Sequence, residues 1–293
     1  MTFGFCDQPF EIRTAKVCIE PLAHFSRTVH NVLSDGQTVD RWFYPPPMCK
    51  GSRNTFVPRR TFGLPHTHSI TCIDNDPERL RFLIWVFGFF AGIATSPDPN
   101  PFINCTPVVH GELFDRYCFR SEMKRVVPRA EAFWDRCKQR KKALRGFANV
   151  IHTLWIAQSK TLLHFESFHY AYLCIDACWK LTILLKGITG DRAKPRHGEL
   201  IGRLSEEWQM PDPEWNKIVD LRNGLIHEAG IMGRPLGAAL VPNFKRKGSN
   251  LPPEMCSFVM RVVTAALDVG ANEYVRSSVA GDGPYLLFDT HQT

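Results

Sequence analysis

The pattern of apolar and polar positions changes near residue 128 of this 293-residue chain. Before it, short runs of β-branched and aromatic residues alternate with turn-forming sequences such as Asp35-Gly36 and the prolines at 45–47, a pattern typical of strands. The expected strands are 17–19, 28–33, 42–44, 55–57, 69–73 and 107–110, with further extended structure up to about residue 127. After Pro128, apolar residues follow the 3.6-residue period of helices. We therefore expect an α+β protein with a small β-rich domain at 1–127 that includes one apolar helix, an all-α helical bundle at 128–276 and a tail at 277–293.

Apolar stripes predict about five helices in the second domain. They are one through 147–155, a central helix at 162–186, a short one at 198–208, one that begins at Asp212-Pro213, and a last one from 253 to about 274. The central helix is apolar on more than one face, which is typical of a helix packed on several sides. Its polar residues Glu166, His169 and Asp176 are expected to form hydrogen bonds in the core, with the alternative that one of them faces a cleft.

The most apolar stretch, 82–94, is too short to cross a bilayer, since a membrane-spanning helix needs about 20 residues. We expect a buried helix that Asp76 caps and Pro77 opens. Gly88 and Gly92 allow close packing of this helix, which also leaves a membrane-associated alternative open. The N-terminus carries neither a basic leader nor an apolar run, so a cytoplasmic protein without a membrane partner is expected.

The cysteines and histidines do not predict a metal site. The ten cysteines are scattered and no export signal accompanies them, so free thiols are expected. His66, His68 and Cys72 lie close together in the sequence, but no second cluster with zinc-ligand spacing completes a site. We therefore expect neither a metal nor another cofactor.

The positive charge of the chain is concentrated in one segment. Residues 120–145 hold ten basic and three acidic side chains, an excess that equals the net charge of +7 for the whole chain. Such a basic face attracts polyphosphate chains, because binding releases their counterions. The RNA-binding candidates within it are Lys138, Arg140, Lys141, Lys142 and Arg145. A solvated helix face explains the same charge run equally well.

One short segment carries residues suited to cleaving RNA. Residues 221–228 read LRNGLIHE, so Arg222 is followed directly by Asn223, and His227 comes after three more residues. RNA supplies its own nucleophile, the 2′-hydroxyl, so its cleavage does not require a metal-bound water. A histidine can move the proton, an arginine can brace the phosphoryl oxygens, and the amide of Asn223 can orient the histidine ring or a phosphate. On an ideal helix Arg222 and His227 point about 140° apart, so one protomer does not bring them together.

The order of the predicted helices, with this motif at the end of the fourth, resembles the HEPN superfamily. Members of that family carry an arginine and a histidine separated by four to six residues, usually with a polar residue directly after the arginine. The resemblance covers about 129–276 and implies a metal-independent endoribonuclease whose catalytic residues are Arg222, Asn223 and His227. It also implies a homodimer, in which two protomers build one composite cleft that binds the RNA substrate.

The same resemblance implies a biological role. It points to phage defence by abortive infection, or to toxin-like growth arrest, with a phage-derived trigger or an antitoxin-like inhibitor as a further partner. The segment 64–69, followed by the apolar helix, resembles more loosely the ApeA-like branch of the family. In that branch a β-rich domain precedes the bundle, which implies a sensing or regulatory role for the first domain.

The spacing alone is not specific, because the chain repeats it elsewhere. The other matches are Arg59 or Arg60 with His66, Arg145 with His152, and Arg192 with His197. Only Arg222 combines a polar neighbour with the expected helix. An arginine and a histidine near a helix end also cap carbonyls and complement the helix dipole. Three alternatives therefore stay open: this structural role, a non-catalytic HEPN module for dimerisation or nucleotide binding, and a nucleic-acid-binding or membrane-surface regulator.

Overall fold

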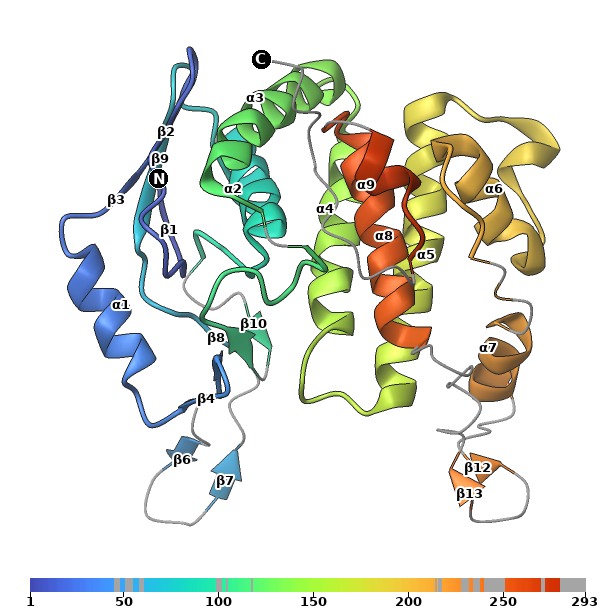
Figure 1. The fold of residues 1–293 in the computed structure, drawn as a ribbon, viewed down its shortest axis with the longest axis horizontal. Coiled ribbons are helices and arrows are strands. Elements are labelled where there is room, and N and C mark those ends of the chain that lie inside the picture. Colours follow the sequence, from blue (N-terminus) through green and yellow to red (C-terminus); the bar gives the residue numbers. More distant parts are fainter. Residues whose placement is uncertain are drawn as a thin grey trace. The chain divides into compact units, whose positions relative to one another are not determined.

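The computed structural model divides the chain into two compact units, Met1–Arg136 and Cys137–Thr293. Short sheets lie in the first unit and helices dominate the second, so the protein is mixed α+β and the predicted order of the two regions is confirmed (Figure 1). The structure describes residues 1–44, 48–50, 55–57, 61–98, 102–103, 105–116, 118–213, 215, 218–227, 232–233, 238–239, 251–269 and 272–279. Of the predicted tail at 277–293, residues 280–293 lie outside this described part.

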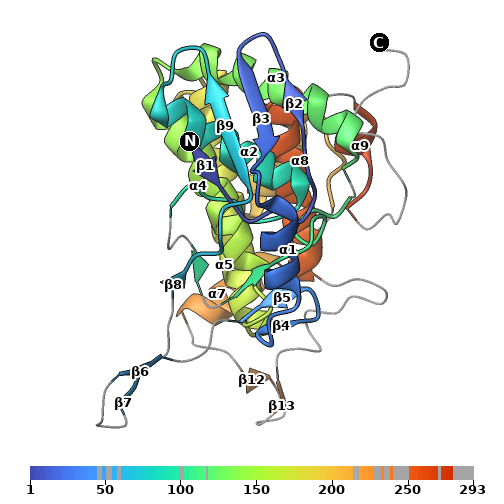
Figure 2. The same cartoon turned by 90° about the vertical axis from the view of Figure 1, so that its left-hand side faces the viewer.

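An antiparallel sheet of four strands organises the first unit (Figure 2). Its order is β1 (Thr2–Phe3), β9 (His68–Cys72), β3 (Val17–Pro21) and β2 (Ile12–Arg13). The pairing of β3 with β9 runs from Val17 opposite Cys72 to Pro21 opposite His68. Every second residue of β9, namely His68, Ile70 and Cys72, is buried. Because side chains alternate along a strand, one face of this sheet contributes to the core.

Shorter strands complete the described β structure of the first unit. β4 (Thr38–Val39), β5 (Trp42–Phe43) and β11 (Thr106–Pro107) form one sheet, β6 (Met48–Lys50) pairs with β7 (Thr55–Val57), and β8 (Thr61–Phe62) pairs with β10 (Phe102–Ile103). The strands predicted at 17–19, 42–44, 55–57 and 69–73 are confirmed, with small shifts at their ends. The strand predicted at 107–110 is shorter and begins one residue earlier.

Residues 28–33 form part of a helix, so the strand predicted there is wrong. The helix is α1, which spans Phe25–Leu33. Phe25, Val29 and Val32 recur every three or four residues and therefore share one helix face, on which Val32 is buried. The β-branched residues favour a strand, but the helical spacing of the apolar positions determines the structure.

α2, Pro77–Ala91, is the buried helix expected from the apolar stretch. The carboxylate of Asp76 caps it by accepting hydrogen bonds from the backbone N–H groups of Glu78 and Arg79. Eleven of its fifteen residues are buried, so it is apolar on nearly every side. No helix in the described part of the chain has both the length and the apolar character needed to span a membrane.

Gly88 and Gly92 allow close contacts with nearby backbone. Gly92 ends α2 with a φ of 65°, and a Cβ at this position would lie 2.7 Å from Cα of Gly111. A Cβ at Gly88 would overlap the hydroxyl of Thr95, which donates a hydrogen bond to the carbonyl oxygen of Ile84. Both contacts join α2 to the chain that follows it.

We expect Gly92→Ala to lower the free energy of unfolding by more than about 2 kcal/mol, since the left-handed conformation and the overlap with Gly111 both oppose a Cβ. Gly36→Ala is the control, because nothing lies within 4 Å of a Cβ there. Urea unfolding followed by circular dichroism measures both changes. A Gly92→Ala protein as stable as the wild type would contradict the close backbone contact.

α3, Arg120–Cys137, runs through Pro128, where the sequence predicts the domain boundary. The compact units divide at Arg136 instead, and the extended structure predicted up to residue 127 is wrong from Arg120 onward. Two valines before a proline favour extended backbone, but the buried positions follow a helical period. They include Met123, Val126, Val127, Ala130, Phe133, Trp134 and Cys137. Burial of this stripe offsets the loss of one backbone donor at Pro128.

Six helices form most of the described part of the second unit. They are α4 (Lys141–Ala157), α5 (His164–Lys186), α6 (Leu200–Trp208), α7 (Ile218–His227), α8 (Leu251–Ala266) and α9 (Asn272–Arg276). α5 contacts α4, α6, α7 and α8, which confirms the central helix predicted at 162–186. The last predicted helix, from 253 to about 274, is two helices, α8 and α9.

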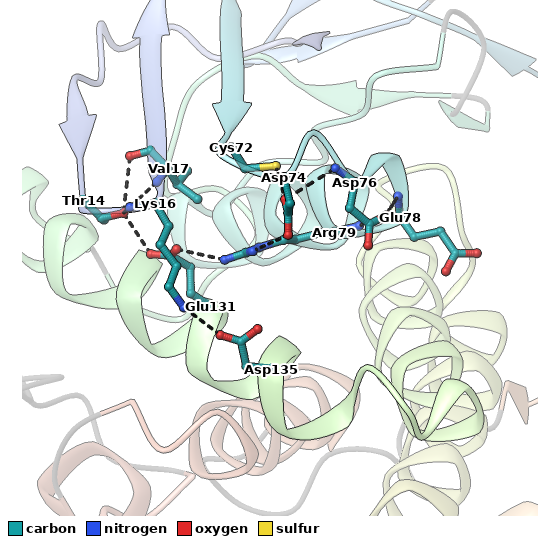
Figure 3. Close-up of polar contacts among 10 residues, drawn as sticks. All are labelled: Thr14, Lys16, Val17, Cys72, Asp74, Asp76, Glu78, Arg79, Glu131 and Asp135. Atoms are coloured by element: carbon teal, nitrogen blue, oxygen red, sulfur yellow. Dashed lines mark hydrogen bonds and ion pairs between the residues drawn. The ribbon is translucent and has the colours of Figure 1, made fainter.

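A buried arginine joins three parts of the first unit (Figure 3). Arg79 of α2 is 4% exposed, and its Nη1 lies 2.7 Å from Oδ2 of Asp74. Its Nη2 lies 3.1 Å from Oε1 of Glu131 on α3. The other carboxylate oxygen of Glu131 accepts a hydrogen bond of 2.9 Å from the hydroxyl of Thr14, between β2 and β3. A buried charge needs such partners, because removing an ion from water is costly unless it is paired.

Candidate functional site

The predicted catalytic motif lies on α7, beside the N-terminal half of α5 (Figure 1). α7 also contacts the short 3-10 helix η2 (His197–Glu199). Arg222 and Asn223 are half-buried in the middle of α7. His227 is the last residue of α7, and its side chain lies outside the described part of the structure. The motif is therefore helical at all three positions, as the sequence predicts.

Contacts with Asn223 and Tyr172 orient the Arg222 guanidinium. Its Nη1 donates a hydrogen bond of 2.9 Å to Oδ1 of Asn223. Its guanidinium carbon lies 5.9 Å from the ring centroid of Tyr172 on α5, where the negative face of the ring attracts a cation. Asn223 thus positions the arginine side chain. Arg222 is a pre-oriented cation on a half-buried helix, which suits it to binding an anion.

Tyr172 connects Arg222 to a second histidine. The Tyr172 hydroxyl lies 3.0 Å from Nδ1 of His197 in η2. Burial raises the pKa of Tyr172, the negative charge of Asp176 raises it further, and the positive charge of Arg222 opposes the rise. The phenol therefore stays protonated at neutral pH and remains a hydrogen-bond donor. Three segments far apart in the sequence, α5, η2 and α7, meet around this tyrosine.

The sequence alone does not mark Tyr172 and His197 as site residues. Tyr172 lies in the apolar central helix, and His197 belongs only to a spacing match with Arg192 that crosses Pro195. The only local signal is the spacing of Tyr172 and Asp176, which are four apart and share a helix face. The contact with His197 depends on how the chain folds back on α5, which no short-range pattern encodes.

Glu166, one of the polar residues in the central helix, has a structural role. Its Oε2 accepts a hydrogen bond of 2.8 Å from the backbone N–H of Leu163, just before the start of α5. This bond satisfies one of the backbone donors that every helix N-terminus leaves without a helical partner. Glu166 is therefore hydrogen-bonded, as expected, but at an exposed helix end rather than in the core.

The five RNA-binding candidates surround the start of α4. Lys138, Arg140, Lys141, Lys142 and Arg145 are all exposed. The first turn of α4 contains no acidic residue, so its lysines oppose the positive end of the helix dipole. The Cβ of an alanine at Gly146 would touch Leu181 of α5, and the helical rise places Leu181 about 14 Å beyond Tyr172. The basic residues and Arg222 therefore lie toward opposite ends of α5.

His66, His68 and Cys72 each bond to neighbouring protein groups. Nδ1 of His66 lies 2.8 Å from the hydroxyl of Thr2, and Sγ of Cys72 lies 2.9 Å from Oδ1 of Asp74. Nε2 of His68 lies 3.3 Å from the backbone N–H of Phe10, and its Nδ1 lies 3.0 Å from the hydroxyl of Thr67. Within the described ranges, no group of three or more histidine, cysteine or acidic side chains can hold a metal ion.

The burial of His68 predicts a loss of stability in mild acid. Burial lowers the pKa of His68 from 6.5 to about 4. Below pH 6.5 the unfolded chain therefore binds a proton that the folded protein does not bind until about pH 4. The contribution of neutral His68 to the free energy of unfolding is complete above pH 6.5 and decreases as the pH is lowered from 6.5 to about 4. The total decrease is about 3 kcal/mol.

Urea unfolding at several pH values between 7 and about 4.5 measures this dependence. We expect the wild type to lose stability more steeply than His68→Gln over this range. Asp7 does not interfere, because hydrogen bonds from His110 outweigh the effect of burial and lower its pKa below 3.8. Equal slopes for the two proteins would show that His68 is not the group that titrates.

Known proteins provide no further guidance to the site. The chain matches no model of a known protein family, no curated protein and no solved structure. A function for this chain must therefore be inferred from the chemistry of its own side chains.

Proposed function

We propose that this chain is a metal-independent endoribonuclease of the HEPN type, with Arg222, Asn223 and His227 as its catalytic residues. The observation that carries the proposal is the geometry of Arg222, whose guanidinium is held by Asn223 and lies over the ring of Tyr172. Arginines that cap a helix lie in its last turn, whereas Arg222 lies in the middle of α7. This placement favours a role in binding an anion over a purely structural one.

The reaction requires one nucleophile, one base, one acid and a stabiliser of negative charge. A base removes the proton of the ribose 2′-hydroxyl, the 2′-oxygen forms a bond to phosphorus, and the bond from phosphorus to the 5′-oxygen breaks. An acid returns a proton to the departing 5′-oxygen, which leaves a 2′,3′-cyclic phosphate and a 5′-hydroxyl. His227 supplies proton transfer, and Arg222 stabilises the phosphoryl oxygens as their charge increases.

The proposal includes a homodimer. Arg222 and His227 point about 140° apart on an ideal helix, so their side chains do not meet on one α7. Two copies of α7 placed side by side can bring the arginine of one protomer to the histidine of its partner. The composite cleft then holds two copies of the motif.

The exposed basic residues at the start of α4 would bind the RNA backbone. Positive charge at this helix end is unfavourable for the free protein, because it opposes the helix dipole. Binding of phosphates relieves that repulsion and releases counterions. An RNA that binds both this patch and Arg222 would extend along α5 by about the rise between Tyr172 and Leu181, which is about 14 Å.

The biological role that follows is growth arrest. Cleavage of cellular RNA halts growth, which serves in phage defence by abortive infection and in toxin systems. The activity must be held off in uninfected cells, so a phage-derived trigger or an antitoxin-like inhibitor belongs to the proposal. The first unit, which holds the four-stranded sheet, is the proposed sensing or regulatory element.

Incubation of the purified protein with single-stranded RNA in excess EDTA tests the proposal. We expect cleavage of the RNA and none of the same oligonucleotide with 2′-O-methyl groups, because methylation blocks the nucleophile. RNA binding with a steep salt dependence but without cleavage would instead favour a nucleic-acid-binding regulator, for which the exposed basic residues of α4 are the supporting observation. Absence of both would leave the non-catalytic dimerisation module as the better account.

A further inference from the structure

The Arg222 site contains a histidine outside the motif. His197 is exposed, while its Nδ1 lies 3.0 Å from the hydroxyl of Tyr172, a residue that is 3% exposed. The ring of the same tyrosine lies 5.9 Å from the guanidinium carbon of Arg222. Tyr172 thus places His197 and Arg222 on the same part of the second unit. The other ring nitrogen of His197, Nε2, has no protein partner among the residues that the structure describes.

The hydroxyl of Tyr172 can hold His197 in both of its protonation states. A phenol is both a donor and an acceptor of hydrogen bonds. It accepts from Nδ1–H of the imidazolium, and it also accepts from Nδ1–H of the neutral ring that remains once Nε2 has lost its proton. In both of these states the contact fixes the ring, and in the imidazolium Nε2 carries a proton directed away from Tyr172. A fixed N–H and a pre-oriented guanidinium that both contact Tyr172 are suited to binding a phosphodiester.

We propose that His197 is a further catalytic residue of this site, which donates the proton to the departing 5′-oxygen, and that Tyr172 is its positioning residue. The inference rests on the proposed ribonuclease function and names its acid. The imidazolium of His197 transfers its Nε2 proton to the 5′-oxygen as the bond from that oxygen to phosphorus breaks. The neutral ring that remains keeps its proton on Nδ1 and donates it to the Tyr172 hydroxyl. His227 is then free to act as the base toward the 2′-hydroxyl, so the two proton transfers have separate histidines.

A substrate with a sulfur leaving group separates this role from a structural one. When the bridging 5′-oxygen is replaced by sulfur, the leaving thiolate is stable without protonation, because thiols are far more acidic than alcohols. We expect His197→Ala to lower kcat on ordinary RNA by about 10²- to 10⁴-fold, with little change in KM. On the 5′-thio substrate the same variant should cleave within about threefold of the wild type, because the acid is no longer needed.

Two control variants accompany this experiment. His164→Ala removes another exposed histidine of the second unit, at the start of α5, and should leave both substrates unaffected. Tyr172→Phe keeps the ring beneath Arg222 but removes the hydroxyl, so it should slow ordinary RNA by about tenfold through the loss of one hydrogen bond, and the 5′-thio substrate by less. Circular dichroism spectra and melting temperatures identify any variant that has lost its fold.

The outcomes distinguish the two proposals. Ordinary RNA cleaved at the wild-type rate by His197→Ala would overturn this inference and leave the ribonuclease function intact. A folded His197→Ala protein equally slow on both substrates would also overturn it, since a proton donor is dispensable for a thiolate leaving group. A wild-type protein that cleaves neither substrate would instead overturn the ribonuclease function, and with it the proposed role of His197 as the acid.

Discussion

Arg222→Ala and His227→Ala are each expected to lower the rate of RNA cleavage by about 10²- to 10⁴-fold, because the first removes the charge that stabilises the transition state and the second removes a proton-transfer group. Both rates are measured on 5′-labelled RNA in excess EDTA. Arg222→Lys should recover little activity, since lysine keeps the charge but not the paired donors of the guanidinium. Asn223→Ala should have a smaller effect, because it loosens the Arg222 side chain without removing it.

The control for this series is Arg203→Ala, an arginine of α6 that pairs with the exposed Glu206. It should cleave RNA at the wild-type rate. Equimolar mixing of the Arg222→Ala and His227→Ala proteins should restore part of the activity, if two protomers share one cleft. An active wild type with two equally active motif variants would disprove the assignment of the site to α7.

A second large effect is expected in the first unit, where Glu131→Ala should lower the free energy of unfolding by about 3 kcal/mol. The substitution removes the partner of Nη2 of Arg79, whose side chain is 5% exposed, and leaves a buried charge without half of its compensation. The expected cost is at the lower end of the range for broken buried pairs, about 3–5 kcal/mol, because Asp74 still pairs with Nη1. Urea unfolding measures the change.

Asp135 offers a matched control one helical turn further along α3. Its carboxylate pairs with Lys16 at 3.0 Å, but both side chains are at least one-third exposed. Asp135→Ala should therefore cost less than about 1 kcal/mol. The double variant Arg79→Met with Glu131→Leu should recover most of the stability that Glu131→Ala loses, because it leaves no buried charge. Equal effects of the Glu131 and Asp135 substitutions would contradict the difference in burial on which this expectation depends.

Helix caps and apolar stripes in the sequence predict the helices that they begin or line. Asp76 and Pro77 mark the start of α2, and the helical position of Arg222 follows from the apolar stripe of α7. α1 and the first part of α3 are not predicted as helices, because their valines favour strands locally. Burial of one helix face determines their secondary structure instead. Such competition between propensity and packing is resolved only in the folded chain.

The candidate site shows the same division. Arg222, Asn223 and His227 lie within six consecutive residues, so a motif can identify them. Tyr172 and His197 belong to the site because α5 contacts η2. The local sequence of neither segment predicts this contact. The basic residues near α4 are correctly expected to be exposed, but their separation from Arg222 depends on the antiparallel packing of α4 against α5.

The chemical ends of the RNA fragments show whether the 2′-hydroxyl of the RNA is the nucleophile. Mass spectrometry of fragments produced in excess EDTA should reveal a 2′,3′-cyclic phosphate, or the monophosphate formed by its hydrolysis, on one side of each break and a 5′-hydroxyl on the other. These ends are produced only when the 2′-oxygen of the RNA attacks its own phosphate. Fragments with 3′-hydroxyl and 5′-phosphate ends would contradict the account, because they require attack by water rather than by the RNA.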